Sequence, residues 1–283
     1  MIAQMVANRI APLVHREGLG GGYFLLTFRH RETAVEARAG QFVMIKAGSS
    51  AELPLRRPFS IMTTDPERET FTLFVKEVGA GSRALCALSP GEGAQCLGPL
   101  GRHFTPPPEG TEALLVAGGY GVAPFQLFGA LLQGRGGSGR LFYGGRTALD
   151  LPLLDRLSRG GVPVVPATED GSVGHHGRVT GAVAEWLDGI RGPARLYACG
   201  PEAMLHAVAR LAGERALAAE VSLDPWMGCG LGTCLSCVVP IQRRGEARPK
   251  YRCACTEGPV FDAARVVWPG EASSREHGEE AGA

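Results

Sequence analysis

The sequence lacks any apolar run long enough to cross a membrane, because none reaches the roughly 18 consecutive residues that a membrane span requires. Residues 1–16 also lack a basic stretch followed by an apolar core, so they do not resemble a secretory signal peptide. We therefore expect a protein of the cytoplasm that does not contact a membrane.

An excess of charge of one sign is missing as well. Lysine and arginine number 29 against 28 aspartates and glutamates, and the formal net charge of +1 argues against a nucleic-acid partner. What is present is an ordinary globular composition with 45% hydrophobic residues. A chain of 283 residues has room for two domains and a small appendage.

Residues 1–107 are predicted to form an antiparallel β-barrel or sandwich. Short apolar runs at 23–28, 42–45 and 71–75 are bounded there by glycine, proline and charged residues. Three consecutive prolines, Pro106-Pro107-Pro108, mark the boundary that follows.

Residues 108–222 alternate between two kinds of pattern. The sequence predicts strands over 114–117, 141–143, 162–166 and 195–198, and helices over 124–133, 151–159, 180–187 and 202–211. This alternation predicts a doubly wound parallel sheet. Residues 223–270, rich in cysteine and glycine, are expected to form a small third domain, and the polar residues 271–283 a disordered tail.

The chain has eight cysteines, which in the cytoplasm are expected to be metal ligands or free thiols. Cys86 and Cys96 lie in apolar surroundings, and we interpret them as small core residues. Cys229, Cys234 and Cys237 instead follow the spacing C-x4-C-x2-C that is typical of plant-type ferredoxins. This spacing predicts a [2Fe–2S] cluster.

Glycines at 228, 230 and 232 let this loop turn sharply enough for three thiolates to surround one cluster, and their amides can donate to the sulfurs. A structural zinc site is the alternative, but zinc sites usually pair two short cysteine knuckles. Either Cys253 or Cys255 can supply the fourth ligand, so five cysteines are candidates for four ligand positions.

Two glycine loops follow predicted strands of the second region. The first, Gly118-Gly119-Tyr120-Gly121, precedes Pro124 at an expected helix start, where a pyrophosphate can approach backbone amides. The second, Cys199-Gly200-Pro201, lies at the same edge of the predicted sheet, where ligands bind. Glycine loops after strands are also common for steric reasons, but the place of the first loop at the first strand-to-helix turn of this region favours nucleotide binding. The second loop can equally be a simple helix cap.

The first region contains two further candidate segments. Arg57-Pro58-Phe59-Ser60 combines an arginine that can hold a phosphate with a serine that can hydrogen-bond a flavin edge. Gly79-Ala80-Gly81-Ser82 precedes a helix-like run and is another possible anion-binding turn.

Together these motifs resemble the ferredoxin reductase-type flavoproteins. The cysteine segment, which continues into Cys255-Thr256-Glu257-Gly258-Pro259-Val260-Phe261, resembles more narrowly the electron-transfer subunits of NAD-dependent (class 1B) dihydroorotate dehydrogenases. The resemblance extends from about Arg57 to Phe261. It implies an FAD-binding barrel over 1–107, an NAD-binding domain over 108–222 and a [2Fe–2S] domain over 223–270.

The resemblance also implies which residues bind each cofactor. The FAD contacts would be Arg57, Pro58, Phe59, Ser60, Phe74, Val75, Lys76, Gly81 and Ser82. The NAD contacts would be Gly118, Gly119, Gly121, Gly200 and Pro201, with Cys199 nearest the flavin. The cluster ligands would be Cys229, Cys234, Cys237 and, by resemblance alone, Cys255 rather than Cys253.

The implied function is electron transfer in pyrimidine (UMP) biosynthesis. An FMN-containing dihydroorotate dehydrogenase subunit, in a heterotetramer of two plus two chains, would pass electrons through the cluster and FAD to NAD⁺. Cys253 and the segment Asp224-Pro225-Trp226 depart from the family pattern. Arg146, which could meet a 2′-phosphate, leaves NAD against NADP open.

Two other functions fit the same layout. One is the flavin and iron–sulfur subunit of an NADH-dependent ferredoxin:NADP⁺ oxidoreductase or of a cytoplasmic hydrogenase. The other is a zinc-stabilised nucleotide-binding protein without redox activity.

Overall fold

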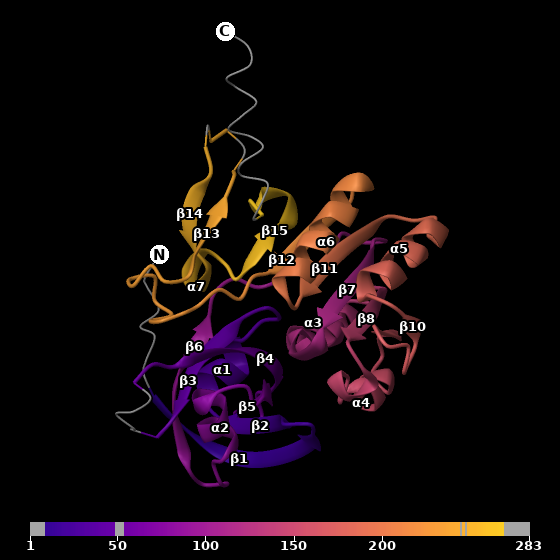
Figure 1. Ribbon diagram of the computed structural model, residues 1–283. Coiled ribbons are helices and arrows are strands. Elements are labelled where there is room, and N and C mark those ends of the chain that lie inside the picture. The colour runs from indigo at the N-terminus through magenta and orange to yellow at the C-terminus, as the bar shows by residue number, and fades with distance from the viewer. Residues whose placement is uncertain (1–8, 49–53, 244, 247, 269–283) are drawn as a thin grey trace.

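The computed structural model describes residues 9–48, 54–243, 245–246 and 248–268. It contains a β-barrel, a parallel sheet flanked by helices, and a two-stranded extension (Figure 1). The tail predicted at 271–283 lies outside the described residues. Among the helices of the described part, none has both the length and the apolar character to cross a membrane.

The barrel is closed and antiparallel, with the strand order β1-β2-β5-β4-β3-β6. Alternate side chains such as Val43 and Ile61 fill its interior, whereas Met44 and Met62 face outward toward the rest of the chain. Its elements are β1 (Arg9–Gly20), β2 (Tyr23–Arg29), α1 (Arg31–Glu36), β3 (Phe42–Ala47), β4 (Arg57–Asp65), β5 (Thr70–Lys76), α2 (Ala80–Cys86) and β6 (Gly93–Leu100).

The second part is a seven-stranded sheet in the order β10-β9-β8-β7-β11-β12-β15, parallel except at β15. Its elements are β7 (Glu112–Gly118), η1 (Gly119–Val122), α3 (Ala123–Gly134), β8 (Gly139–Gly145), η2 (Ala148–Asp150), α4 (Leu154–Ser158), β9 (Val164–Thr168), β10 (His175–His176), α5 (Val179–Gly189), β11 (Ala194–Cys199), α6 (Glu202–Glu214) and β12 (Ala218–Ser222). The strand order reverses direction between β7 and β11, which makes that boundary the topological switch point.

The predicted fold class is confirmed, but one predicted helix is shorter than expected. The pattern over 151–159 gives only α4, Leu154–Ser158. Pro152 disfavours helical backbone at the residue before it, and Leu151 accordingly has φ −115° and ψ 48°. The chain therefore reaches α4 through the 3-10 turn η2.

The cysteine-rich segment forms β13 (Val238–Ile241), β14 (Lys250–Cys253), α7 (Ala254–Glu257), β15 (Val260–Asp262) and η3 (Ala263–Arg265). The β13–β14 hairpin projects from the body of the molecule, while β15 returns to it (Figure 1). Because β15 pairs antiparallel with β12, the segment ends as the edge strand of the parallel sheet. No pattern in the sequence indicated this return.

An aromatic cluster joins the barrel to the parallel sheet just before the three prolines. Phe104 stacks on Phe125 with 5.5 Å between ring centroids, and Phe128 lies 4.7 Å from Tyr197. The Tyr197 hydroxyl donates to the Thr105 carbonyl over 2.8 Å. Each aromatic pair adds about 0.5–1.5 kcal/mol beyond its buried area, so this linker is firmly seated.

Candidate functional site

The predicted cluster loop, residues 228–237, lies directly on the outer surface of the barrel. Gly230 has φ +74°, and a Cβ built there would lie 2.6 Å from the Met44 Cγ on β3. Two of the predicted ligands, Cys237 and Cys255, are buried and share one hydrophobic core with Met44. Glycine at position 230 is therefore needed both for the left-handed backbone and for this close approach.

The structure brings the four predicted cluster ligands into one neighbourhood as two pairs. Cys229 interacts with Cys234, and Cys237 interacts with Cys255. The thiol rotamers do not close these pairs into one set, since no three Cys, His, Asp or Glu side chains among the described residues converge as metal ligands. Four thiols on one small segment nevertheless form the donor set that an iron–sulfur cluster takes.

The loop favours the thiolate form at its accessible end. Partial burial acts to raise the pKa of Cys229, but hydrogen bonds from the Thr233 hydroxyl and the Leu231 amide outweigh it and lower that pKa to about 6. A hydrogen bond with Ser236 likewise lowers the pKa of Cys234. Burial raises the pKa of Cys255 to about 12, so metal binding there must displace a proton.

The cysteines interpreted as core residues are confirmed as such. Cys86 and Cys96 are fully buried in the barrel interior. Burial raises the pKa of each thiol to about 12, which keeps both protonated and unreactive.

The predicted flavin strand β4 runs beside β3, and Pro58 pairs with Met44 across them. Pro58 and Ser60 share the outward face, whereas the half-buried Phe59 packs against the barrel interior. On β5, Phe74 faces outward and stacks on Tyr23 at 5.4 Å, while Val75 is buried inside the barrel. The outward faces of β4 and β5 thus form one surface.

Arg57 and the segment at α2 are close together. A Cβ on Gly81 would lie 3.2 Å from the Arg57 Nε, so the arginine packs closely over this turn. The Ser82 hydroxyl accepts from the amides of Val78 and Gly79 at 2.9 and 3.1 Å. Ser82 therefore caps its own helix, which fixes the turn beneath Arg57.

Lys76, predicted as a flavin contact, also joins the two larger parts of the molecule. Its Nζ donates to the Tyr23 hydroxyl over 2.8 Å and pairs with Asp150 Oδ1 at 3.4 Å. The hydrogen bond to Tyr23 and the charge of Asp150 raise the pKa of Lys76. Burial acts to raise the pKa of Asp150, but the hydrogen bond with Lys76 outweighs burial and lowers that pKa.

The two glycine loops meet at the switch point of the sheet. Ala117 at the end of β7 lies opposite Cys199 at the end of β11. A Cβ on Gly118 would lie 2.6 Å from Pro201 Cδ, and one on Gly121 would overlap the Cys199 carbonyl. Gly118 and Gly121 thus permit loop-on-loop contact, whereas Gly119, with φ +53°, has open space around it.

Cys199 ends β11 at the meeting point of these loops. It is buried, and burial together with the charge of Asp224 raises the pKa of its thiol to about 12. The half-exposed Tyr120 is also close to Asp224 and Cys199. Asp224 is exposed to solvent, but neighbouring groups displace part of the water around it, which raises its pKa.

Sequence reasoning missed Tyr23, Asp150 and Asp224. Tyr23 is 53 residues from Lys76, and Asp150 is 74 residues from it. No local pattern signals partners so distant in the chain. Asp224 was noticed only as a departure from the family pattern, and its nearness to Cys199 needs the fold.

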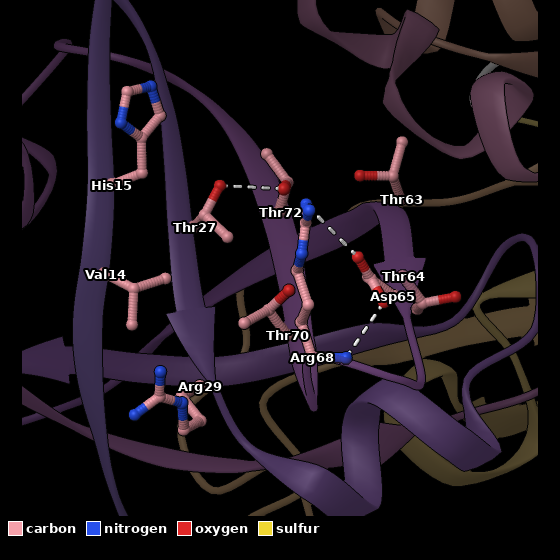
Figure 2. Close-up of a pocket in the computed structure, with 10 residues that line it drawn as sticks. All are labelled: Val14, His15, Thr27, Arg29, Thr63, Thr64, Asp65, Arg68, Thr70 and Thr72. Atoms are coloured by element: carbon pink, nitrogen blue, oxygen red, sulfur yellow. Dashed lines mark hydrogen bonds and ion pairs between the residues drawn. The ribbon is translucent and has the colours of Figure 1, made fainter.

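A hollow of about 600 Å³ lies elsewhere (Figure 2). It lies on the outer face of the barrel, where the Thr27 and Thr72 hydroxyls bond at 2.9 Å and Arg68 pairs with Asp65. None of the predicted cofactor residues lines it. The hollow is therefore separate from the candidate cofactor sites.

Three protein-family models match consecutive parts of the chain. An oxidoreductase FAD-binding domain matches residues 15–104, and an oxidoreductase NAD-binding domain matches residues 115–210. The iron–sulfur cluster binding domain of dihydroorotate dehydrogenase B matches residues 224–267. The predicted cofactors FAD, NAD and an iron–sulfur cluster agree with these three domains.

Curated relatives extend this match over most of the chain. A dihydroorotate dehydrogenase B (NAD(+)) electron transfer subunit from Desulforamulus reducens is 35% identical, over 87% of this chain and 92% of its own length. The same subunit from Shouchella clausii is 38% identical, over 82% and 87%. The chain belongs to the family of dihydroorotate dehydrogenase B electron transfer subunits. Membership in a family of electron transfer subunits implies that a separate catalytic subunit exists.

Solved structures place this family member among ferredoxin reductase-type folds. A structure of an NADH-dependent reduced ferredoxin-NADP oxidoreductase superposes with a TM-score of 0.81 and 28% identity, covering 98% of each chain. Phthalate dioxygenase reductase superposes with a TM-score of 0.63 at 18% identity, covering 92% of this chain and 95% of its own. The second likeness concerns the fold alone.

Proposed function

We propose that this chain carries electrons between NAD⁺ and an FMN-containing catalytic subunit that oxidises dihydroorotate, in pyrimidine (UMP) biosynthesis. FAD exchanges electrons in pairs with NAD(H) and singly with a [2Fe–2S] cluster, and this chemistry belongs to the cofactors. The chain's own residues hold the cofactors at fixed positions. The cytoplasm and an assembly of two plus two chains fit this role.

The observation that carries the proposal is the seating of the cluster loop. Gly230 packs on Met44, and Met44 lies directly opposite Pro58 on the proposed flavin strand. Neighbouring strands are about 4.8 Å apart, so the strand beneath the cluster loop is only one strand spacing from the proposed flavin strand. This closeness favours direct electron exchange between the two cofactors.

The proposed ligands divide the work of holding the cluster. Cys229 and Cys234 lie toward solvent, and Cys237 and Cys255 are buried at the base. The amide of Leu231 donates to the Cys229 sulfur over 3.3 Å, which favours a negative charge there.

The proposed flavin site uses the outward residues Pro58, Ser60, Phe74 and Lys76, with Arg57 over Gly81 on the phosphate side. Phe59, Val75 and Ser82 support it from the barrel wall and the α2 turn. The cation of Arg57 suits a diphosphate.

The proposed NAD site is the switch point, where Gly118 and Gly121 lie against Gly200 and Pro201 and Gly119 has open space around it. Cys199 at the end of β11 would lie nearest the flavin. Arg146 is paired with Asp150, Nε to Oδ2 at 3.7 Å, and a carboxylate beside it disfavours a 2′-phosphate. We therefore propose NAD(H) over NADP(H), which a comparison of NADH and NADPH as reductants of the bound flavin tests.

The proposed docking surface for the catalytic subunit surrounds the cluster loop. Three large apolar side chains project there: Trp226 is 90% exposed, Leu235 60% and Leu231 49%. Exposed aromatic anchors are typical of interface centres. A catalytic subunit bound at this surface would lie directly against the cluster loop, where electrons would pass between the two subunits.

Reconstitution tests the proposal. The chain, purified with FAD and cluster, is mixed with a dihydroorotate dehydrogenase catalytic subunit carrying FMN, and dihydroorotate-dependent reduction of NAD⁺ is followed. We expect turnover only with both chains present. Trp226→Ala is expected to weaken binding of the subunits by about 2 kcal/mol, or roughly 30-fold, with iron content unchanged. Leu149→Ala, an 82% exposed residue of η2, is the matched control without effect.

The second candidate function is that of the flavin and iron–sulfur subunit of an NADH-dependent ferredoxin:NADP⁺ oxidoreductase. One observation favours it, the superposition on the NADH-dependent reduced ferredoxin-NADP oxidoreductase. If a folded, FMN-loaded catalytic subunit fails to bind or to supply electrons, the chain is to be assayed with reduced ferredoxin and NADP⁺. Turnover in that assay alone would replace the proposed partner.

A further inference from the structure

Cys253 is a fifth thiol at the cluster site, and no role follows for it from a four-ligand cluster. It is half-buried at the end of β14 and begins the short helix α7, which carries Cys255 in its first turn. The two cysteines are therefore presented by one turn of chain.

Backbone pairing fixes Cys253 beside the cluster loop. Val238, the residue after Cys237, pairs with Cys253 across β13 and β14. The Ala254 amide donates to the Cys237 carbonyl over 2.9 Å. The position of Cys253 relative to Cys237 is thus set by two independent backbone contacts.

The side chain of Cys253 points into the same group of thiols. Its Sγ lies 3.9 Å from the Gly232 carbonyl of the cluster loop. It also interacts with the thiol of Cys237 and lies near Cys229. Cys255 has the same two neighbours, Cys237 and Cys229. Both candidates for the fourth position therefore lie within reach of the same partners.

The two candidates differ in their access to water. Cys255 is 1% exposed and is packed in the apolar core beneath the loop. Cys253 is half-buried, like Cys229, and Cys234 is exposed. The site therefore has two buried thiols and three more accessible ones, and either Cys253 or Cys255 can add a fourth ligand to the three loop cysteines.

We propose that Cys253 is a reserve ligand of the [2Fe–2S] cluster, able to take the fourth position when Cys255 is not bound to iron. In this exchange the Cys253 sulfur loses its proton as it binds iron, and the Cys255 thiolate gains one as it leaves, so no electron is transferred. The cluster would then be held by three outer thiols and Cys237. This proposal rests on the cluster assigned under the proposed function.

Iron and acid-labile sulfide content of anaerobically purified variants tests this proposal, with visible circular dichroism and electron paramagnetic resonance spectra of the same samples. Cys253→Ser is expected to keep the wild-type content and spectra. Cys255→Ser is expected to keep most of its iron and sulfide with shifted spectra, because a different and more accessible sulfur completes the site. Cys253→Ser combined with Cys255→Ser is expected to lose nearly all of both elements.

Two controls separate folding from ligation. FAD content and thermal unfolding of each variant report whether the barrel remains intact. Cys96→Ala removes a buried barrel cysteine and is expected to leave iron content unchanged. A chelator is expected to remove iron faster from Cys255→Ser than from the wild type, because Cys253 is the more accessible thiol.

The outcomes separate a failure of the reserve-ligand proposal from a failure of the proposed function. If Cys255→Ser retains FAD but is as empty of iron as the double variant, Cys253 does not act as a ligand and the proposal is overturned. If Cys253→Ser alone loses the cluster, Cys253 is the resident ligand, which also overturns it. A wild-type protein that binds zinc and no iron would overturn the proposed function itself, and the reserve ligand with it.

Discussion

The glycine loop at the switch point and the glycine loop of the cluster resemble each other in sequence but are built for different purposes. Positions 118 and 121 require glycine because the Cys199–Pro201 segment of the same sheet packs on them. Position 230 requires glycine because the loop packs on Met44 of the barrel. The first loop is positioned relative to its own sheet and the second relative to the proposed flavin strand.

This difference bears on electron transfer. The cluster loop shares a buried apolar core with the barrel, so its distance from β4 is fixed. The switch point meets the barrel through a second buried apolar core, in which Val122 joins Met62 and Phe74. Polar contacts such as Lys76 with Asp150 add to it. Both regions are therefore fixed against the barrel: the cluster loop lies on β3 beside β4, and the switch point packs on the barrel through the shared core.

Gly121→Ala is the substitution expected to have the largest effect. Its Cβ would overlap the Cys199 carbonyl, and backbone cannot be displaced as a flexible side chain can. Overpacking of this kind destabilises by about 1–3 kcal/mol or more. We expect a lower melting temperature and loss of flavin reduction by NADH in stopped-flow absorbance, with the iron content retained.

Gly213→Ala is the control for that variant. Gly213 lies in α6 with open space around it, so alanine is expected to be neutral or to stabilise by up to about 1 kcal/mol. If Gly121→Ala melted and reacted like Gly213→Ala, loop-on-loop packing would not be the reason for the glycine.

Gly230→Ala is expected to impair cluster binding and to leave flavin reduction by NADH intact, the reverse of Gly121→Ala. A left-handed φ of +74° costs alanine about 1–2 kcal/mol, and its Cβ would also displace Met44. We expect reduced iron content, measured colorimetrically, while NADH still reduces the flavin at the wild-type rate. Full iron content in this variant would contradict the account of how the loop is seated.

Asp150→Asn is expected to have the smallest effect, about 1 kcal/mol, because the amide oxygen of asparagine can still accept from Lys76 and Tyr23. The Lys76 hydrogen bond holds the pKa of Asp150 below its usual value, so the contribution of this carboxylate to stability is present above about pH 4. It is lost as the pH falls through the lowered pKa.

The difference in unfolding free energy between wild type and Asp150→Asn should therefore shrink as the pH is lowered from 7 toward 3. Thermal unfolding across that range measures it. A difference that stays constant with pH would show that the charge of Asp150 does not act in this contact.

Local signals account for what the sequence could predict. Short apolar runs bounded by glycine and proline predicted the barrel strands, and alternation of strands and helices predicted the parallel sheet. The C-x4-C-x2-C spacing predicted the cluster loop, because its ligands are consecutive in the chain. The choice of Cys255 needed family likeness, since Cys253 satisfies the same local pattern.

Contacts between distant segments account for what it could not. The pairing of β15 with β12 joins Phe261 to Val221, and no pattern in either strand specifies the other. The Lys76–Asp150 contact depends on how the barrel meets the sheet. The reason for Gly121 is the carbonyl of Cys199, 78 residues later in the chain, and only the fold shows it.

Electron exchange between the cluster and the flavin is the central claim, and one titration tests it most directly. The purified chain is titrated anaerobically with NADH while visible absorbance follows the flavin and electron paramagnetic resonance follows the cluster. The account predicts that flavin bleaching is accompanied by the paramagnetic signal of a reduced [2Fe–2S] cluster, without any partner subunit. Flavin that bleaches while the cluster stays oxidised, in a sample whose cluster dithionite reduces, would contradict it.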